Sequence, residues 1–403
     1  MKIAVLKEWG AQAAAHERRV PIVPDSVKRL GQKKIEVVVE PGAGERALSA
    51  DADYAKEGAT IAAGQAAAIA DSDTVMRLRV PTLEEVALMK EGSTLFAPLL
   101  PLVNHDLVKA LAAKKITSFA VDFIPRTTVA QMMDVLSSQG TAAGYYAVVL
   151  AASQLPRFFP MLITAAGTIA PATLLVLGAG VAGLSAIGAG KRLGARVEAF
   201  DVRKVVKEQV ESLGAKFVEV DSEEDAQTAG GYAKEVSEEY KKKQAEAIAN
   251  HVAKADVVIC TALIPGKRAP ILVTEAMVKA MKPGSVIVDL AAEQGGNCEG
   301  CEAGKTVVKN GVTIIGALDL PSNLAVHASQ MWSRNMEKLM FHLTKDGTLK
   351  LDMKDEITRG CLITHGGDVV QERVREALGL PKLDKPEAPA ADPKPAAAAG
   401  GAS

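Results

Sequence analysis

Short apolar runs alternate with amphipathic segments over the first third of the chain, as in a sheet covered by helices. The apolar runs predict strands at residues 2–6, 35–40, 74–78, 94–97 and 118–122. The segments between them predict helices at residues 26–30, 83–88 and 106–111. Because strands alternate with helices, residues 1–137 are expected to form an α/β domain around a mainly parallel sheet.

The same alternation returns after a largely apolar helical pattern over residues 134–155, which is long enough to bridge two domains. Further strands are predicted at residues 174–177, 196–200, 216–220, 256–260, 285–290 and 313–315. Six strands with helical crossovers match a doubly wound, dinucleotide-binding domain. An amphipathic segment at 329–343 is expected to return to the first domain.

The predicted fold class is therefore α/β, with two Rossmann-like doubly wound domains joined by long helices. We expect the first domain to comprise residues 1–137 with 325–380, and the second to comprise residues 138–324. Residues 381–403 are rich in proline and alanine and lack core-forming side chains. That composition predicts a flexible, disordered tail.

Residues 158–190 contain no charged side chain apart from none at all over 158–190, and a run of that length could cross a membrane. The run also contains Pro160, Pro171 and many glycines. A buried strand followed by a helix explains it better than a membrane span.

A glycine motif inside this run gives the first indication of function. The apolar run at 173–177 ends in Gly178, Gly180 and Gly183, and a second apolar run ends at Asp201. In the dinucleotide-binding fingerprint, the first glycine allows the turn, the second lets a pyrophosphate approach and the third lets the helix pack. The helix N-terminus offers free N–H groups to the phosphates, and the acid accepts hydrogen bonds from a ribose. The motif predicts a nucleotide site, although an empty Rossmann fold could carry the same turn.

The acid at the end of the second run bears on the choice of nucleotide. Asp201 would repel a 2′-phosphate, which favours NAD. Arg203 lies two residues later and could receive that phosphate. We give more weight to Asp201, because an acid at the strand end meets the ribose directly.

Composition excludes some other classes of function. The net charge is −1 and aromatic residues make up 4%, which argues against a nucleic-acid-binding surface. The first residues read as a strand rather than a secretory signal, so we expect a cytosolic protein with reduced thiols. Cys298 and Cys301 have CxxC spacing, but no second pair completes a metal set, and a loop with two incidental cysteines is the better interpretation.

Several strings go beyond what a generic fold requires. They are Lys7-Glu8 with the run at 17–20, and the runs at 39–44, 125–139, 261–267 and 288–297. Together with the segment at 230–235, they resemble the NAD(H)-binding component of proton-translocating transhydrogenases, in the family that also contains alanine dehydrogenases. The resemblance covers about residues 1–380.

The resemblance implies a site for NAD(H) and a role for each matching residue. The residues that would surround the nicotinamide, its ribose and the pyrophosphate are Arg126, Gln131, Asp134 and Ser137. Those on the adenosine side would be Val181, Asp201, Val202 and Arg203, with Gly231 and Tyr232 in a mobile loop that closes over the site. Thr261, Ala262 and Leu263 would form the strand-end turn beside the nicotinamide.

The same resemblance implies partners. Hydride would pass directly between NADH here and NADP⁺ on a partner subunit, coupled to inward proton movement through an integral-membrane subunit. The chain would be a homodimer, peripheral on the cytoplasmic face of the plasma membrane. A protein that binds NAD without catalysis is a further alternative.

An alanine dehydrogenase acting alone is the main rival. That family uses a lysine and a histidine on its substrate, where this sequence matches with Arg77 and Leu100, and Glu293 replaces an aspartate. Leu100 cannot transfer a proton, which argues against a self-contained dehydrogenase. The chain also departs from the transhydrogenase pattern at Asn323, where arginine is usual, and over residues 324–335.

Overall fold

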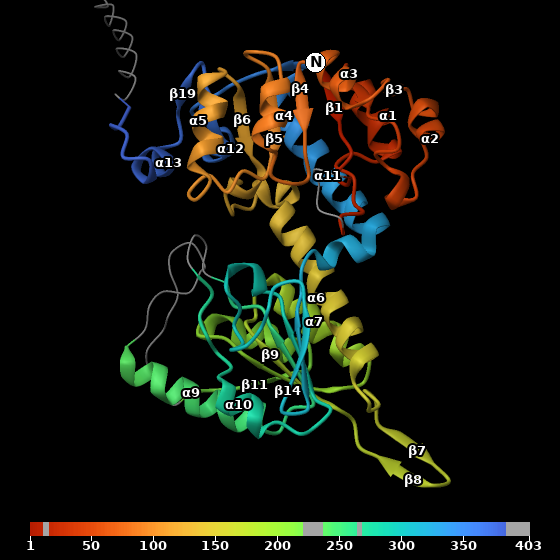
Figure 1. The fold of residues 1–403 in the computed structure, drawn as a ribbon, viewed down its shortest axis with the longest axis vertical. Coiled ribbons are helices and arrows are strands. Elements are labelled where there is room, and N and C mark those ends of the chain that lie inside the picture. The colour runs from red at the N-terminus through yellow and green to blue at the C-terminus, as the bar shows by residue number, and fades with distance from the viewer. Residues whose placement is uncertain (11–15, 221–236, 264–267, 384–403) are drawn as a thin grey trace, which may run out of the picture.

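The computed structural model describes residues 1–10, 16–220, 237–263 and 268–383. Two α/β lobes lie one above the other, and long helices run between them (Figure 1). Each lobe contains its own large sheet with helices on both faces. The predicted fold class, with two Rossmann-like domains, is confirmed.

The first lobe is built on an eight-stranded sheet in the order β19-β18-β6-β5-β4-β1-β2-β3. The six strands from the N-terminal part of the chain pair in parallel, whereas β18 and β19 are antiparallel additions. The strands are β1 (Lys2–Val5), β2 (Glu36–Val39), β3 (Thr60–Ile61), β4 (Thr74–Met76), β5 (Thr94–Ala97), β6 (Thr117–Ala120), β18 (Leu362–His365) and β19 (Asp368–Val369).

Seven helices accompany this sheet in the described part of the chain. They are α1 (Pro24–Gln32), α2 (Asp51–Lys56), α3 (Gln65–Ala70), α4 (Leu83–Leu88), α5 (His105–Ala113), α12 (Glu356–Cys361) and α13 (Glu372–Ala377). Buried side chains on the two faces of the sheet form two separate hydrophobic clusters. The sheet is therefore covered on both sides, as its near-continuous apolar strands require.

The second lobe contains a seven-stranded sheet in the order β11-β10-β9-β12-β13-β15-β14. Its strands are β9 (Thr173–Leu177), β10 (Arg196–Phe200), β11 (Lys216–Phe217), β12 (Val257–Cys260), β13 (Val286–Asp289), β14 (Thr306–Lys309) and β15 (Val312–Gly316). All pairs are parallel except β14 with β15. The chain order reverses between β9 and β12, and ligands bind at such a switch point, beyond the carboxyl ends of the strands.

The second sheet is covered by α7 (Val181–Arg192), α8 (Lys207–Ser212), α9 (Glu238–Val252) and α10 (Glu275–Ala280). Two longer helices, α6 (Val135–Gln154) and α11 (Ala325–Leu343), connect the lobes (Figure 1). Helix α6 packs against α7 of the second lobe and against α11. Both predicted long helical segments are thus present in the structure.

The charge-free run at 158–190 is divided among several elements. It contains a projecting hairpin, β7 (Leu162–Thr164) with β8 (Gly167–Ile169), then β9 and most of α7. Among the described residues, no helix has the length and apolar character needed to cross a membrane. A second small hairpin, β16 (Thr344–Lys345) with β17 (Thr348–Leu349), follows α11.

The sequence missed the shortest and the outermost strands. The second sheet has seven strands rather than six, because β14 adds an antiparallel edge. In the first sheet β3 and β19 have only two residues each, too few to show a period of two. Of the predicted tail, residues 384–403 lie outside the described part of the chain.

Candidate functional site

The glycine turn joins β9 to α7 at the switch point of the second sheet. Gly178 has φ +103°, and a Cβ there would lie 2.7 Å from Thr261 Oγ1. A Cβ on Gly183 would lie 1.8 Å from the Gly178 carbonyl oxygen, whereas a Cβ on Gly180 would meet no atom within 4 Å. Two of the three glycines are therefore required by the protein's own packing, and Gly180 leaves open space above the helix N-terminus.

Asp201 follows β10 and is 9% exposed. Its Oδ2 accepts a hydrogen bond from Ala179 N at 2.8 Å, which fixes the glycine turn. The guanidinium of Arg203 donates to both carboxylate oxygens, from Nε at 2.9 Å and Nη2 at 2.7 Å. This hydrogen bonding is the main reason that the pKa of Arg203 is raised. Arg203 therefore neutralises the acid expected to receive a ribose.

Helix α6 brings the segment Arg126–Ser137 to the glycine turn. A Cβ on Gly144 would lie 1.9 Å from the Ala182 carbonyl oxygen, so α6 and α7 are in close contact. One turn earlier, Gly140 faces Val181. Because Ser137 precedes Gly140 by three residues, the start of α6 lies beside the start of α7.

The start of α6 is itself a helix cap. Asp134 Oδ1 accepts a hydrogen bond from Ser137 N at 2.9 Å, and Oδ2 accepts one from Ser137 Oγ at 2.6 Å. Gln131 is exposed in the short 3₁₀ helix η3 (Ala130–Met133). Arg126 is exposed just before it. Asp134 and Ser137 thus hold each other, and the expected contacts with a nicotinamide remain a prediction.

Thr261, Ala262 and Leu263 follow β12, on the other side of the switch point. Thr261 Oγ1 donates to the Gly178 carbonyl oxygen at 2.9 Å, so the two strand ends are bridged. Leu263 is 40% exposed, and Val181 is 39% exposed. These apolar side chains lie on either side of the predicted site.

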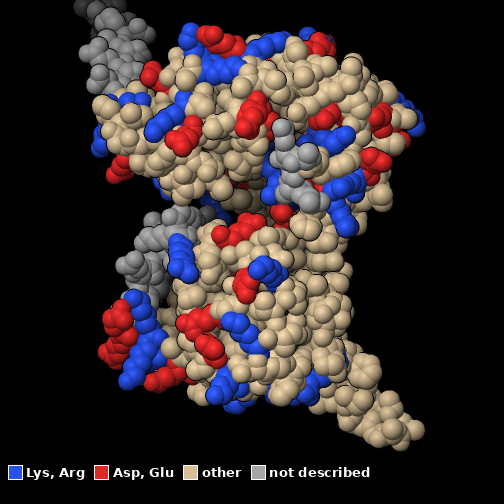
Figure 2. Space-filling model, in the orientation of Figure 1, with Lys and Arg blue, Asp and Glu red and all other residues tan. Residues whose placement is uncertain are grey.

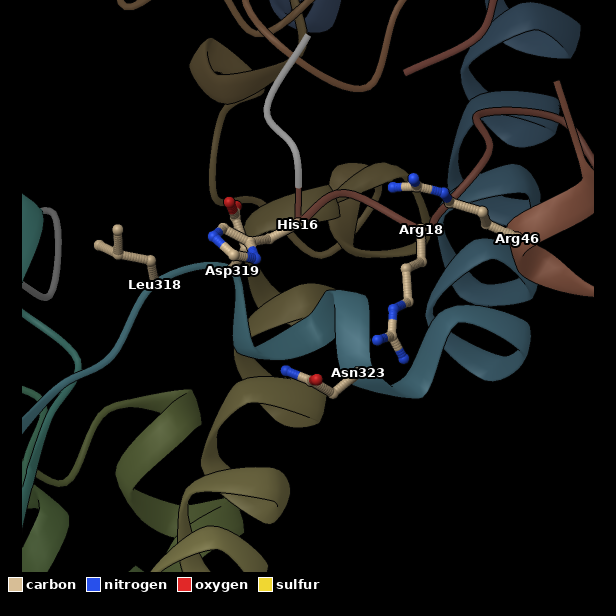
Figure 3. Close-up of a pocket in the computed structure, with 6 residues that line it drawn as sticks. All are labelled: His16, Arg18, Arg46, Leu318, Asp319 and Asn323. Atoms are coloured by element: carbon tan, nitrogen blue, oxygen red, sulfur yellow. The ribbon is translucent and has the colours of Figure 1, made fainter. Parts of the chain in front are cut away.

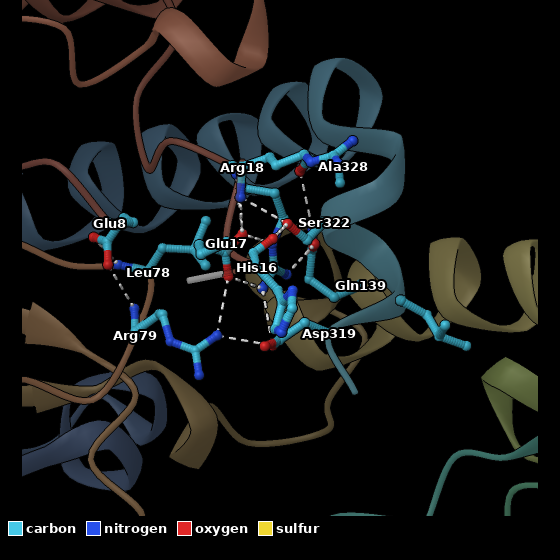
Figure 4. Close-up of polar contacts among 12 residues, drawn as sticks. Glu8, His16, Glu17, Arg18, Leu78, Arg79, Gln139, Asp319, Ser322 and Ala328 are labelled. Carbon is cyan, nitrogen blue, oxygen red and sulfur yellow. Dashed lines mark hydrogen bonds and ion pairs between the residues drawn. The ribbon is translucent and has the colours of Figure 1, made fainter. Parts of the chain in front are cut away.

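An ionic cluster lies between the lobes (Figure 4). Glu17 is fully buried and pairs with Arg19 through both carboxylate oxygens, at 2.8 and 2.7 Å. Arg79 Nη1 lies 3.2 Å from Glu17 Oε2 and 2.8 Å from Asp319 Oδ1. Arg19 also donates to Gln139 of α6 at 2.8 Å. Burial alone would raise the pKa of Glu17, but its bonds to Arg19 and the charge of Arg79 lower it to about 2.

A cavity of about 520 Å³ lies beside this cluster (Figure 3). It is lined by His16, Arg18, Arg46, Leu318, Asp319 and Asn323. Of the predicted site residues that the structure describes, none lines this cavity. We therefore place the candidate site at the switch point, where the glycine turn and α6 meet.

Two family matches cover most of the chain. Residues 5–143 match the alanine dehydrogenase/PNT N-terminal domain, and residues 147–372 match the alanine dehydrogenase/PNT C-terminal domain. The chain belongs to the alanine dehydrogenase/PNT family.

Relatives in this family fall into two groups. The first portion of NAD(P) transhydrogenase subunit alpha from Rhodospirillum rubrum, which is a separate chain, is 49% identical over 92% of this chain and 98% of its own length. An alanine dehydrogenase of Halomonas elongata is 31% identical over 94% of this chain and 97% of its own length. The crystal structure of a transhydrogenase from Sinorhizobium meliloti has a TM-score of 0.83 and 43% identity, covering 92% of this chain and 100% of that one.

Within the family, the structure separates the residues that were compared with an alanine dehydrogenase. Arg77 is buried and pairs with Glu8 and Glu85, away from the switch point. The arginine beside Asp319 is instead Arg79, two residues later. Leu100 is 50% exposed in the loop after β5 and has φ +46°, with its N–H bound to Asp122.

Two predicted residues and one cluster need separate mention. Gly231 and Tyr232 lie outside the described residues. The described residues contain no group of three or more histidine, cysteine or acidic side chains suited to a metal ion. The ionic cluster around Glu17 was missed, because its members are far apart in sequence and only the local string at 17–20 pointed to it.

Proposed function

We propose that this chain is the NAD(H)-binding subunit of an NAD(P) transhydrogenase and exchanges hydride reversibly with NADP(H) on a partner subunit. The main support is the open side of Gly180 beside the start of α6. That space lies at a helix N-terminus with no side-chain cap, where a pyrophosphate binds favourably. The identity to the transhydrogenase subunits, 49% against 31% for the alanine dehydrogenase, also favours this assignment.

The residues present fit a dinucleotide. Gly180 leaves room for the pyrophosphate, and the N–H groups of α7 point toward it. Thr127 Oγ1, next to Arg126, is buried without a hydrogen-bond partner among the described residues, as expected of a group that binds a ligand. When bound, NADH supplies the hydride.

The protein's part in the reaction is to position and to exclude water. Gln131 and Arg126 are exposed beside the start of α7, where they can bind the nicotinamide end of the cofactor. Leu100, Leu263 and Val181 supply apolar surface and no proton donor. This composition suits direct hydride transfer, which needs correct distance and orientation rather than acid–base catalysis.

Cofactor choice follows from Asp201. A 2′-phosphate would meet a buried carboxylate that already accepts bonds from Ala179 and Arg203. We propose that NADH binds more tightly than NADPH, by about tenfold or more, which is about 1.4 kcal/mol. Fluorescence titration of both reduced nucleotides measures this ratio, and tighter NADPH binding would contradict it.

We also propose the larger assembly and the domain division. The domains would be residues 1–137 with 325–380, and 138–324, which agrees with the residues that each sheet contains. The chain would act as a homodimer, peripheral on the cytoplasmic face of the membrane. Its partners would be an NADP(H)-binding subunit and an integral-membrane subunit that couples the exchange to proton translocation with Re/Si stereospecificity.

The test of function uses the chain with an NADP(H)-binding transhydrogenase component. NADH and NADP⁺ should then give NADPH, and omission of either protein should abolish the product. NADH with pyruvate and ammonia should remain unoxidised. Turnover with pyruvate and ammonia would favour the alanine dehydrogenase alternative, and lack of any exchange would favour a non-catalytic protein.

A further inference from the structure

A chain of hydrogen bonds joins the carboxyl ends of three neighbouring strands at the switch point. Thr261, after β12, binds the carbonyl oxygen of Gly178, after β9. Ala262 is bound in turn by Asn297, and Asn297 by Asp289 at the end of β13. The glycine turn and the predicted nicotinamide-facing turn therefore share one hydrogen-bonded support.

Asn297 is the central member of this support and is fully buried. Its Oδ1 accepts a hydrogen bond from Ala262 N at 3.0 Å, and its Nδ2 donates to Ala262 O at 2.9 Å. The same Nδ2 donates to the Pro270 carbonyl oxygen at 2.8 Å. One amide thus holds both backbone polar groups of Ala262, which fixes the orientation of the peptide planes on either side.

Asp289 fixes Asn297 in its turn. Its carboxylate accepts hydrogen bonds from Asn297 N at 2.7 Å, Cys298 N at 2.9 Å and Ala291 N at 2.9 Å. The Cys301 thiol also donates to it, and burial of that thiol raises its pKa to about 12. The CxxC pair therefore provides hydrogen-bond donors to a buried acid, which gives both cysteines a structural part in the loop.

We propose that Asn297, held by Asp289, is a positioning residue for hydride transfer, because it sets the backbone of Ala262 against the nicotinamide. The inference rests on the proposed function. Hydride transfer requires the reacting carbons at close range, and small displacements of supporting groups lower the rate strongly. Loss of the amide should therefore slow transfer more than it weakens binding.

The test compares Asn297→Ala with a control at the opposite edge of the same sheet. Asp256 is 6% exposed, and its Oδ2 accepts a hydrogen bond from Thr173 N at 2.9 Å where β9 begins. Asp256→Ala removes a buried backbone clamp of comparable size, far from the switch point. Both variants should lower the melting temperature. Only Asn297→Ala should lower the transfer rate, by about tenfold or more, with the Kd for NADH changed less than about threefold.

A second variant keeps the test valid if Asn297→Ala fails to fold. Asn297→Asp retains the acceptor for Ala262 N, loses both donors and places a carboxylate beside Asp289, the acid that faces it. Protonation of the new carboxyl restores one donor, so the transfer rate relative to wild type should rise as the pH is lowered. A flat ratio would contradict a positioning role.

The outcomes separate the two proposals. Absence of exchange by the wild-type chain with its partner component would overturn the proposed function and this inference with it. Exchange by wild type together with equal rates for Asn297→Ala and Asp256→Ala would overturn only the role of Asn297.

Discussion

At the scale of single residues, the three glycines of the turn have different reasons for being there. Gly178 and Gly183 are required by contacts with Thr261 and with the turn itself, so they would be needed in an empty Rossmann fold as well. Gly180 has no such contact, and its φ of −74° is open to any residue. Gly180 is therefore the glycine that reports on a ligand.

This difference gives a matched pair of substitutions. Gly180→Ala should leave the free energy of unfolding within about 0.5 kcal/mol of wild type. It should weaken NADH binding about tenfold or more, because the methyl group occupies the pyrophosphate space. Gly183→Ala should instead destabilise the fold by more than about 2 kcal/mol, since its Cβ would overlap the Gly178 carbonyl. Denaturant unfolding and NADH titration measure both effects, and unchanged NADH binding by Gly180→Ala would contradict the site.

At the scale of elements, the apolar runs predicted every central strand of both sheets, because buried parallel strands are apolar on both faces. The two-residue edge strands carried no such signal. The glycine turn was also predictable, since its chemistry is local. The engagement of Asp201 by Arg203 and the clamp of Asn297 on Ala262 were not, because they depend on how side chains meet after folding.

The segment before α6 carries the next prediction. Gln131→Asn shortens an exposed side chain in η3 by one methylene and should slow hydride transfer more than about tenfold, or about 1.4 kcal/mol in the barrier. The Kd for NADH should change little, because the pyrophosphate contacts are on α7. Stopped-flow measurement of single turnovers separates the two quantities.

The matched control for that substitution lies at the other end of the same helix. Gln154→Asn changes an exposed glutamine in the last turn of α6, and transfer should keep its wild-type rate. Equal rates for the two variants would remove Gln131 from the site.

At the scale of the whole molecule, the ionic cluster ties the lobes together. Arg79 of the first lobe bridges Glu17 and Asp319, and Asp319 lies in the crossing from β15 to α11. Arg19 extends the cluster to α6 through Gln139. The geometry at the start of α6 thus depends on charges that are buried between the lobes.

The pKa of Glu17 makes this cluster testable by pH. Its folded value of about 2 lies below its ordinary value of 4.5, so its contribution to stability is present above pH 4.5 and lost as the pH falls toward 2. The shift corresponds to about 3 kcal/mol. Glu17→Gln should therefore lower the free energy of unfolding strongly at about pH 6 and much less near pH 2. A pH-independent difference between variant and wild type would contradict the ionic role.

The projecting hairpin bears on oligomeric state. Figure 2 shows this arm free of charged side chains on the visible face. Phe158, Met161 and Ile163 are 55%, 56% and 79% exposed there, which is costly for an isolated chain. We expect Ile163→Lys to shift a homodimer toward monomer, as measured by light scattering, whereas the same change at exposed Val308 on β14 should not. A wild-type monomer would contradict the proposed dimer.

The central claim is that hydride passes directly from NADH on this chain to NADP⁺ on a partner. The most direct measurement supplies NADH deuterated at the transferred position, in ordinary water, to the chain and an NADP(H)-binding component. Mass spectrometry of the NADPH should find one deuterium per molecule formed. NADPH without the label, or no NADPH at all, would contradict the account.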